Sequence, residues 1–328
     1  MWQVIGHPWA VELLGRAISA QRIAHTYLFT GPANTGKAHL ARELAAALNC
    51  TGDAPPCRVC VPCLKTMRGV HPDVTLVEPD SDKFKIDQVR ELQRNLSLSP
   101  YEGRWRVCLM TDFQTATVEA ANALLKTLEE PPSRVVLILT ATDASLLLPT
   151  IVSRCQVLPL RAVPPLEIER ALIERWHVPQ AQARVLARLS AGRVGWAIRA
   201  AQDAAILVRR HQRIEELQEL LQKGRAAKIL AAERISERED LAEMIRFWQT
   251  WWRDVVLLCS GCEELVTHLD CLSPLRHQAQ QSDLAAAEKA LRYTEAALTQ
   301  LEQNVNPRLA LEVLLLSWPL VTAMAVHA

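Results

Sequence analysis

Three residues have the types and the spacing that phosphate binding requires. Gly31, Gly36 and Lys37 match the pattern G-x-x-x-x-G-K. In this pattern the glycines let backbone N–H groups turn around the phosphates, and the lysine reaches the β- and γ-phosphates. Pro32 lies inside the loop. The next position, where Ser or Thr would hold Mg²⁺, is Ala38, which has no oxygen to offer. The pattern therefore predicts a site that binds ATP or ADP but binds Mg²⁺ weakly.

Four cysteines form a second group with a spacing suited to chemistry. They follow the pattern C-x₆-C-x₂-C-x₂-C and are Cys50, Cys57, Cys60 and Cys63. Four thiolates this close can complete a tetrahedral Zn²⁺ site, and a closed four-sulfur shell is structural rather than catalytic. The alternative, a set of incidental buried thiols, fits so short and proline-containing a segment less well. We predict a zinc module at about residues 50–63, with His71 as a nearby loop residue.

A later group also contains metal-ligand residue types. It consists of Cys259, Cys262, His268 and Cys271. This group follows an apolar helical stretch and lacks the turn-rich density of the first group. A second metal site and small buried residues at a helix end are both compatible with the pattern, and we favour the buried residues.

An acidic residue after an apolar run could take part in phosphate chemistry. Asp112 follows the run at residues 106–110, where a Walker-type site positions Mg²⁺. The next residue is Phe113, at the place where active ATPases of this type carry a glutamate that polarises water. The pattern therefore argues against hydrolysis by this site alone. The alternative for Asp112 is a helix cap or an ordinary loop residue.

Arg154 is the last candidate, in a segment that follows a strongly apolar run. An isolated loop arginine is usually a solvated surface charge. It can also be an arginine finger, which reaches the nucleotide of a neighbouring subunit and neutralises charge on the γ-phosphate. Spacing alone does not choose between these two readings.

Alternating strands and helices must position these residues. Apolar runs predict strands at 26–30, 74–77, 106–110 and 135–140, and helical spacing predicts helices at 10–19, 39–48, from 86 onward and at 118–130. Pro131 and Pro132 must end the last helix. The continuous run 135–140 is typical of a strand buried on both faces of a parallel sheet. The order predicts an α/β fold with a doubly wound parallel sheet.

The character of the sequence changes near residues 161–165, after which little favours strands. We predict three domains: a phosphate-loop α/β domain at 1–162 that carries the zinc module, a small helical domain at 163–205, and a helical bundle at 206–328. The apolar stretch 309–326 contains Glu312 and Pro319. It predicts a buried terminal helix broken near the proline rather than a membrane span.

Charge and composition exclude some classes of function. The 328 residues include 37 basic and 36 acidic ones, so the chain lacks the positive excess of a dedicated nucleic-acid-binding protein. The first residues do not have the basic, apolar, small-residue layout of a secretory signal. We therefore expect a cytoplasmic protein without a membrane partner, in which clustered cysteines bind metal rather than pair as disulfides.

Several motifs together resemble the bacterial clamp-loader subunits of the AAA+ class. They are AHTYLFTGP at 24–32, the four cysteines, HPD at 71–73, NALLKTLEEPP at 122–132, LPTIVSRCQ at 148–156 and NVNPRL at 304–309. The match is dense over residues 1–160 and looser in the helical regions. The motifs at 122–132 and 153–155 are together specific to clamp loaders, whereas the phosphate loop alone is not.

The resemblance implies a subunit of three parts: an AAA+ ATPase-like domain, a helical lid, and a helical collar that assembles a pentamer. It implies that Arg154 acts in trans at the ATP site of an adjacent motor subunit, and that Thr140 or Thr142 takes the position that senses the γ-phosphate. The implied partners are the gamma/tau motor subunits and the delta subunit. The sliding clamp and primer–template DNA would be reached through the complex.

Three departures from the family's motor subunits concern ATP hydrolysis. Ala38 replaces the Mg²⁺-binding hydroxyl, Phe113 replaces the glutamate, and Gly195 takes the place of an arginine in the lid motif. These losses beside a retained Arg154 predict a stator-like subunit that triggers its neighbour and is not an active ATPase alone. The rival hypothesis is a self-sufficient ATP-hydrolysing motor subunit. A zinc-stabilised DNA-binding module and an adaptor without nucleotide are further alternatives.

Overall fold

The computed structural model describes residues 2–303 and 305–321. Their contacts group the chain into two compact units: residues 1–175 with 192–197, and residues 176–191 with 198–328. The division into domains 1–162, 163–205 and 206–328 stays a prediction. Residue 304 of the NVNPRL motif and residues 322–326 of the predicted terminal helix lie outside the described residues.

A five-stranded parallel sheet forms the centre of the first unit. Its strands are β1 (Thr26–Thr30), β2 (Val74–Val77), β3 (Arg106–Met110), β4 (Val135–Ala141) and β5 (Gln156–Pro159). They lie in the order β2-β3-β4-β1-β5, and every neighbouring pair is parallel. The predicted parallel α/β fold is therefore confirmed. Strand β5 was not expected, because only Leu158 of its four residues is buried and no apolar run marks it.

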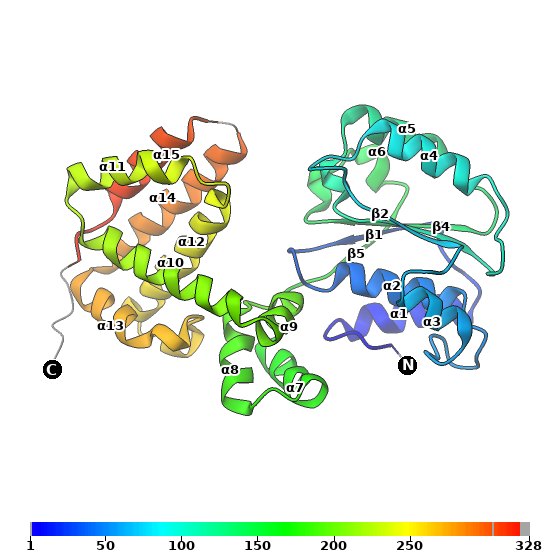
Figure 1. Ribbon diagram of the computed structural model, residues 1–328, viewed down its shortest axis with the longest axis horizontal. Coiled ribbons are helices and arrows are strands. Elements are labelled where there is room, and N and C mark those ends of the chain that lie inside the picture. Colours follow the sequence, from blue (N-terminus) through cyan, green and yellow to red (C-terminus); the bar gives the residue numbers. More distant parts are fainter. Residues whose placement is uncertain (1, 304, 322–328) are drawn as a thin grey trace. The chain divides into compact units, whose positions relative to one another are not determined.

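Helices cover both faces of this sheet, as Figure 1 shows. One face carries α1 (Pro8–Ser19), α2 (Lys37–Leu48) and α3 (Val61–Met67), and the other carries α4 (Ile86–Leu96), α5 (Val118–Glu129) and α6 (Pro149–Val152). Alternate residues of one strand enter opposite cores: Ile138 packs on the α2 side, and Leu137 and Leu139 pack on the α5 side. Burial on both faces explains why β4 is continuously apolar.

Local signals fix where α5 begins and ends. Thr117 precedes it, and its hydroxyl oxygen accepts a hydrogen bond from the backbone N–H of Ala120, which satisfies a donor that the helix leaves unpaired. The helix ends at Glu129, shortly before Pro131 and Pro132. The position of this helix end is relevant to function because Glu129 contacts Arg154, a candidate functional residue.

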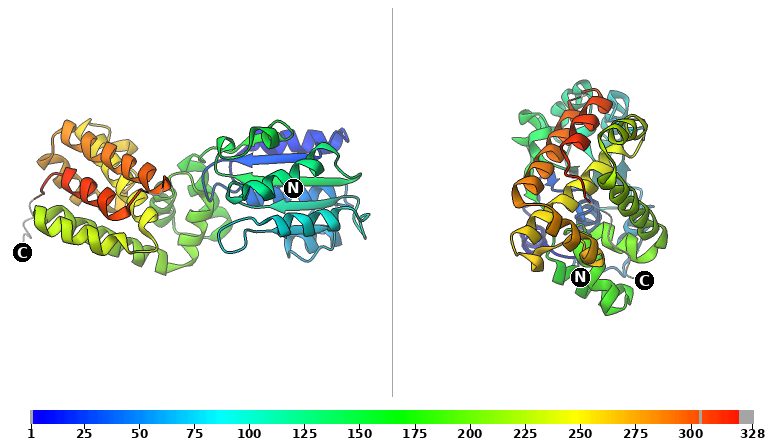
Figure 2. Two further views of the ribbon diagram at one scale, coloured as in Figure 1. Left: turned by 90° about the horizontal axis from the view of Figure 1, so that it is seen from above. Right: turned by 90° about the vertical axis from the view of Figure 1, so that its left-hand side faces the viewer.

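The remaining helices are α7 (Pro165–Trp176), α8 (Gln180–Leu189), α9 (Val194–Gln202), α10 (Ala204–Gln222), α11 (Arg225–Ser236), α12 (Leu241–Cys259), α13 (Leu272–Gln281), α14 (Leu284–Glu302) and α15 (Pro307–Ser317). Within the second unit, α12 packs on α14, and α15 lies between α11 and α14 (Figure 2). Trp248, Trp252 and Trp318 meet in its core.

Helix α15 ends before Pro319, as expected. No helix in the described part of the chain is long and apolar enough to cross a membrane.

Candidate nucleotide and metal sites

The phosphate loop connects β1 to α2, and its two glycines are required by its geometry. Gly31 has φ 139°, and a Cβ there would lie 2.0 Å from the carbonyl oxygen of Leu160. Gly36, at the start of α2, has φ 101°. Both angles lie in the region that side chains disfavour. The loop leads directly into the N-terminus of α2, where free N–H groups and the helix dipole favour an anion.

Lys37 is folded back onto this loop. Its Nζ donates hydrogen bonds to the carbonyl oxygens of Gly31 (2.6 Å) and Pro32 (2.8 Å). The residue is only 6% exposed. Burial lowers the pKa of its ammonium group, and the nearby Asp112 carboxylate opposes that shift. A phosphate oxygen carries negative charge and would therefore be a stronger acceptor for this ammonium group than the two carbonyl oxygens.

Two segments hold the outer side of the loop through its carbonyl groups. The backbone N–H of Gly195 donates to the carbonyl of Asn34 at 2.8 Å, and His7 Nε2 lies 3.4 Å from the carbonyl of Thr35. A Cβ at position 195 would lie 3.3 Å from the Asn34 oxygen. The residue in the expected arginine position thus brings the backbone of α9 against the loop. Sequence spacing pointed to Gly195 but not to this contact.

Asp112 and Thr140 are brought together beside the loop. The backbone N–H of Asp112 donates to the hydroxyl of Thr140 at 3.0 Å, and Asp112 has φ 51°. Its side chain makes no capping hydrogen bond to the short helix that follows. Phe113 is buried and packs on Phe84, with ring centroids 5.6 Å apart. Position 113 therefore contributes an apolar ring to the core. Ala38, in the first turn of α2, is partly buried and carries only a methyl group.

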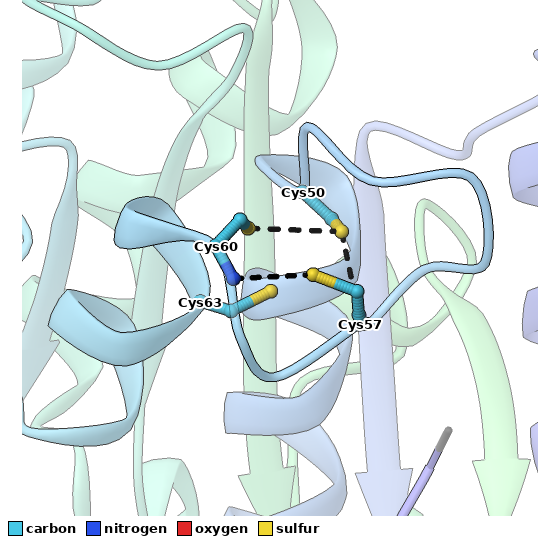
Figure 3. A group of neighbouring side chains, drawn as sticks. All are labelled: Cys50, Cys57, Cys60 and Cys63. Atoms are coloured by element: carbon cyan, nitrogen blue, oxygen red, sulfur yellow. Dashed lines mark hydrogen bonds between the residues drawn. The ribbon is translucent and has the colours of Figure 1, made fainter.

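The four cysteines of the first group converge, as Figure 3 shows. Cys50 follows α2, Cys63 lies in α3, and Cys57 and Cys60 lie on the connection between them. Their four sulfur atoms lie within 4.8 Å of one another. This cluster could hold a metal ion, because four thiolates at such separations can surround one cation.

Hydrogen bonds and burial shift the pKa values of the four thiols in different directions. Burial opposes ionisation of Cys60, but hydrogen bonds from the backbone of Thr51 and Cys63 outweigh it and lower its pKa to about 6. Burial raises the pKa of Cys63 to about 12. Thiolates are the form that binds metal, and N–H donors to sulfur stabilise that form. The donor set therefore fits a soft divalent cation.

The second group of cysteines does not form such a cluster. Cys259 Sγ points at the carbonyl oxygens of Ala279 and Ser282, and His268 is occupied by Arg210 at 2.6 Å. In the described residues, the first group is the only set of three or more candidate ligands that meets. We favoured small buried residues at a helix end. His268 and Cys271 are buried, whereas Cys259 and Cys262 are only partly buried.

Arg154 lies directly after α6 with its guanidinium at the surface. Its Nη1 donates to the carbonyl of Thr150 at 2.9 Å, and its Nη2 donates to Glu129 Oε1 at 2.6 Å. The Arg154 side chain is 34% exposed, and the Glu129 side chain is 51% exposed. Arg154 is therefore held in place and still open to solvent.

Sequence reasoning missed a buried carboxylate between the two sites. Glu43 of α2 is fully buried, and it contacts the guanidinium of Arg58 from the cysteine segment. His39 Nε2 lies 3.4 Å from the same carboxylate. A glutamate inside the Ala/Leu-rich helix was the available signal, but its partner becomes visible only in three dimensions.

Comparisons with known proteins identify the family. A family model described as DNA polymerase III, delta subunit, matches residues 6–164. DNA polymerase III subunit delta' from Bacillus subtilis is 31% identical over 314 residues, which are 94% of this chain and 95% of that protein. The chain belongs to the DNA polymerase III delta' family. The expected clamp-loader resemblance is confirmed at this level.

A second relative of this delta' family member matches about half of the chain. DNA polymerase III subunit tau from Escherichia coli is 37% identical over 177 residues, which are 53% of this chain and 27% of that protein. The chain thus spans about a quarter of that relative. Among solved structures, a gamma subunit-related protein from Thermotoga maritima is 20% identical, with a TM-score of 0.45 over 93% of this chain and 97% of that one.

Proposed function

We propose that this delta' family member acts as a stator in a bacterial clamp loader, supplying an arginine finger without hydrolysing ATP itself. The observation that carries the proposal lies in a single α/β unit. It combines an accessible guanidinium at Arg154 with a phosphate loop whose Mg²⁺ and water positions are Ala38 and the buried Phe113. The function it supports is to trigger a neighbour's ATP site during loading of the sliding clamp.

Arg154 would act on ATP bound to an adjacent gamma/tau motor subunit. Negative charge spreads over the γ-phosphate oxygens in the transition state, and a guanidinium beside them stabilises that charge. Arginine carries five N–H donors, and the contacts with Thr150 and Glu129 leave some of them for phosphate oxygens. Its partial exposure makes that approach possible.

The chain's own loop would bind ATP or ADP without turning it over. The positive φ angles of Gly31 and Gly36, and the position of Lys37 against the loop, support this proposal. Thr140 would sense the γ-phosphate beside Asp112, whose backbone N–H donates a hydrogen bond to the Thr140 hydroxyl. With no carboxylate at position 113, an attacking water has no base there.

We also propose that the cysteine cluster holds a structural Zn²⁺ through Cys50, Cys57, Cys60 and Cys63. Tetrahedral Zn²⁺ with Zn–S bonds of about 2.3 Å places sulfur atoms a little under 4 Å apart, and the Sγ atoms of Cys60 and Cys50 lie 3.9 Å apart. A bound ion would tie the end of α2 to α3. Elemental analysis of the purified chain should give one zinc per chain.

The proposed partners follow from the family. They are the gamma/tau motor subunits and the delta subunit, with the sliding clamp and primer–template DNA reached through the assembled loader. A role in replication also supports a location in the cytoplasm.

The test is the ATPase rate of the reconstituted loader with DNA and clamp, comparing wild-type chain with Arg154→Ala. We expect a fall of at least about tenfold, because arginine fingers contribute large factors to turnover. Arg161→Ala is the matched control, since this exposed arginine makes no ion pair in the described part of the chain. Size-exclusion chromatography would establish that each complex assembles.

An unchanged rate for Arg154→Ala in an intact complex would contradict the finger role. The rival function, a self-sufficient motor, is favoured by the identity with tau over half of the chain. It predicts that the isolated chain hydrolyses ATP with Mg²⁺ and that Lys37→Ala abolishes this turnover.

A further inference from the structure

The guanidinium of Arg154 is held between two helices. Its Nη1 donates to the carbonyl of Thr150 in α6 at 2.9 Å and lies 3.4 Å from Ser153 Oγ. Its Nη2 donates to Glu129 Oε1, at the end of α5, at 2.6 Å. Thr150 and Ser153 are local neighbours in the chain. Glu129 comes from 25 residues away, so this contact is set by the tertiary fold.

Glu129 offers a rigid point of attachment. Helix α5 packs on α4, where Gln93 Nε2 donates to the carbonyl of Ala123 and to the hydroxyl of Thr127. Pro131 and Pro132 restrict the backbone just beyond the helix. The helix end that carries Glu129 is therefore anchored to α4, and the half-exposed carboxylate reaches Arg154 from this anchored position.

We propose that Glu129 is a positioning residue for Arg154: its carboxylate fixes the guanidinium in the orientation in which it meets a neighbour's γ-phosphate. This inference rests on the proposed finger function. A free arginine side chain loses considerable rotamer entropy when it is ordered, and the Glu129 contact meets that cost before the neighbour arrives.

The contact leaves the finger available for catalysis. Arginine has five N–H groups; Glu129, Thr150 and Ser153 take three of them. Within the described residues, one N–H on Nε and a second on Nη2 have no acceptor. Phosphate oxygens can therefore bind while the Glu129 hydrogen bond is kept.

The experiment compares kcat and KM for ATP in the reconstituted loader with DNA and clamp. We expect Glu129→Ala to lower kcat about threefold to fivefold, a size typical of a partly exposed ion pair, with KM unchanged. Glu129→Gln keeps an acceptor oxygen and should retain at least about half of the wild-type kcat. Glu130→Gln is the matched control, because the adjacent exposed carboxylate makes no ion pair in the described residues.

A double-mutant cycle separates positioning from a general structural effect. In an Arg154→Ala background, Glu129→Ala should have no further effect on kcat. The inference is overturned if Glu129→Ala has wild-type or higher kcat, if it lowers kcat equally in both backgrounds, or if Glu129→Gln is as impaired as Glu129→Ala. An unchanged kcat for Arg154→Ala alone would instead overturn the finger function on which the inference rests.

Discussion

At position 38 a methyl group stands where a hydroxyl would meet Mg²⁺. Ala38 follows Lys37 in the first turn of α2. We predict that Ala38→Thr tightens ATP binding in the presence of Mg²⁺ by about threefold to tenfold, since one added polar contact contributes about 1 kcal/mol. Affinity in EDTA should not change. Calorimetric titration under both conditions measures the difference, and equal tightening in both would contradict a metal-linked role for this position.

Single residues were predictable where chemistry depends on local spacing. Gly31 and Lys37 belong to one short loop, and the four cysteines belong to one short segment, so sequence order nearly determines their proximity. Contacts between distant segments were not predictable. The Glu43–Arg58 pair and the Glu129–Arg154 pair join residues from different elements. No periodicity or motif carries the information that these charges meet.

Helix α2 joins the phosphate loop to the cysteine cluster, and a buried ion pair stabilises it. Among the described residues, Arg58→Ala would leave His39 as the remaining ion-pair partner of the fully buried Glu43 carboxylate. Removing one partner of a buried pair leaves an uncompensated charge. We therefore expect the free energy of unfolding to fall by about 3–5 kcal/mol, as measured by urea denaturation.

A double-mutant cycle supplies the control for this element. In a Glu43→Gln background, Arg58→Ala should cost less than about 1 kcal/mol, because no buried charge remains. Arg68→Ala, at an exposed arginine after α3, should be nearly neutral. If Arg58→Ala costs the same in both backgrounds, Arg58 acts through the cysteine segment rather than through Glu43.

Elements marked by an apolar run or by helical spacing were predicted well, and elements without such a mark were not. The strands at 74–77 and 106–110 and the helix ended by Pro131 agree with the structure. Helix α3 and strand β5 were missed, because α3 lies inside the cysteine segment and β5 has no continuous apolar run. Both gain their structure from what surrounds them: α3 from the cysteine cluster, and β5 from pairing with β1.

On the scale of a whole folding unit, stability should depend on pH through Asp254. Burial raises the pKa of this carboxyl to about 6, although backbone N–H groups of His268 and Thr267 oppose the shift. An unfolded aspartate titrates near 3.9. Between about pH 4 and 6 the folded chain therefore binds more protons, and wild-type stability falls as pH rises through this window.

The variant Asp254→Asn removes this titration and keeps an acceptor for both N–H groups. Its free energy of unfolding should improve relative to wild type by about 2–3 kcal/mol between pH 4 and pH 7. Urea denaturation of both proteins at the two pH values measures this difference. A difference that does not change with pH would show that Asp254 titrates alike in the folded and unfolded chain.

Lys37 and Arg154 should act at two different nucleotide sites: Lys37 at the chain's own phosphate loop, and Arg154 at the ATP site of a neighbouring subunit. If hydrolysis takes place on the neighbouring motor subunit, the loader needs Arg154 of this chain but not Lys37. We predict that Lys37→Ala weakens nucleotide binding by the isolated chain at least about tenfold, since it removes the cation that faces the phosphates. The DNA-stimulated ATPase of the assembled loader should stay within about twofold of wild type, because that variant leaves catalysis at the neighbour intact.

For Arg154→Ala we predict the opposite pattern: the isolated chain keeps its nucleotide binding, and the turnover of the loader falls at least about tenfold. Opposite effects of the two variants on nucleotide binding and on loader turnover would distinguish a stator subunit from a motor subunit. A motor subunit needs its own lysine for turnover, so loss of loader activity in Lys37→Ala would favour the self-sufficient ATPase. It would also mean that the methyl of Ala38 and the buried ring of Phe113 do not prevent catalysis.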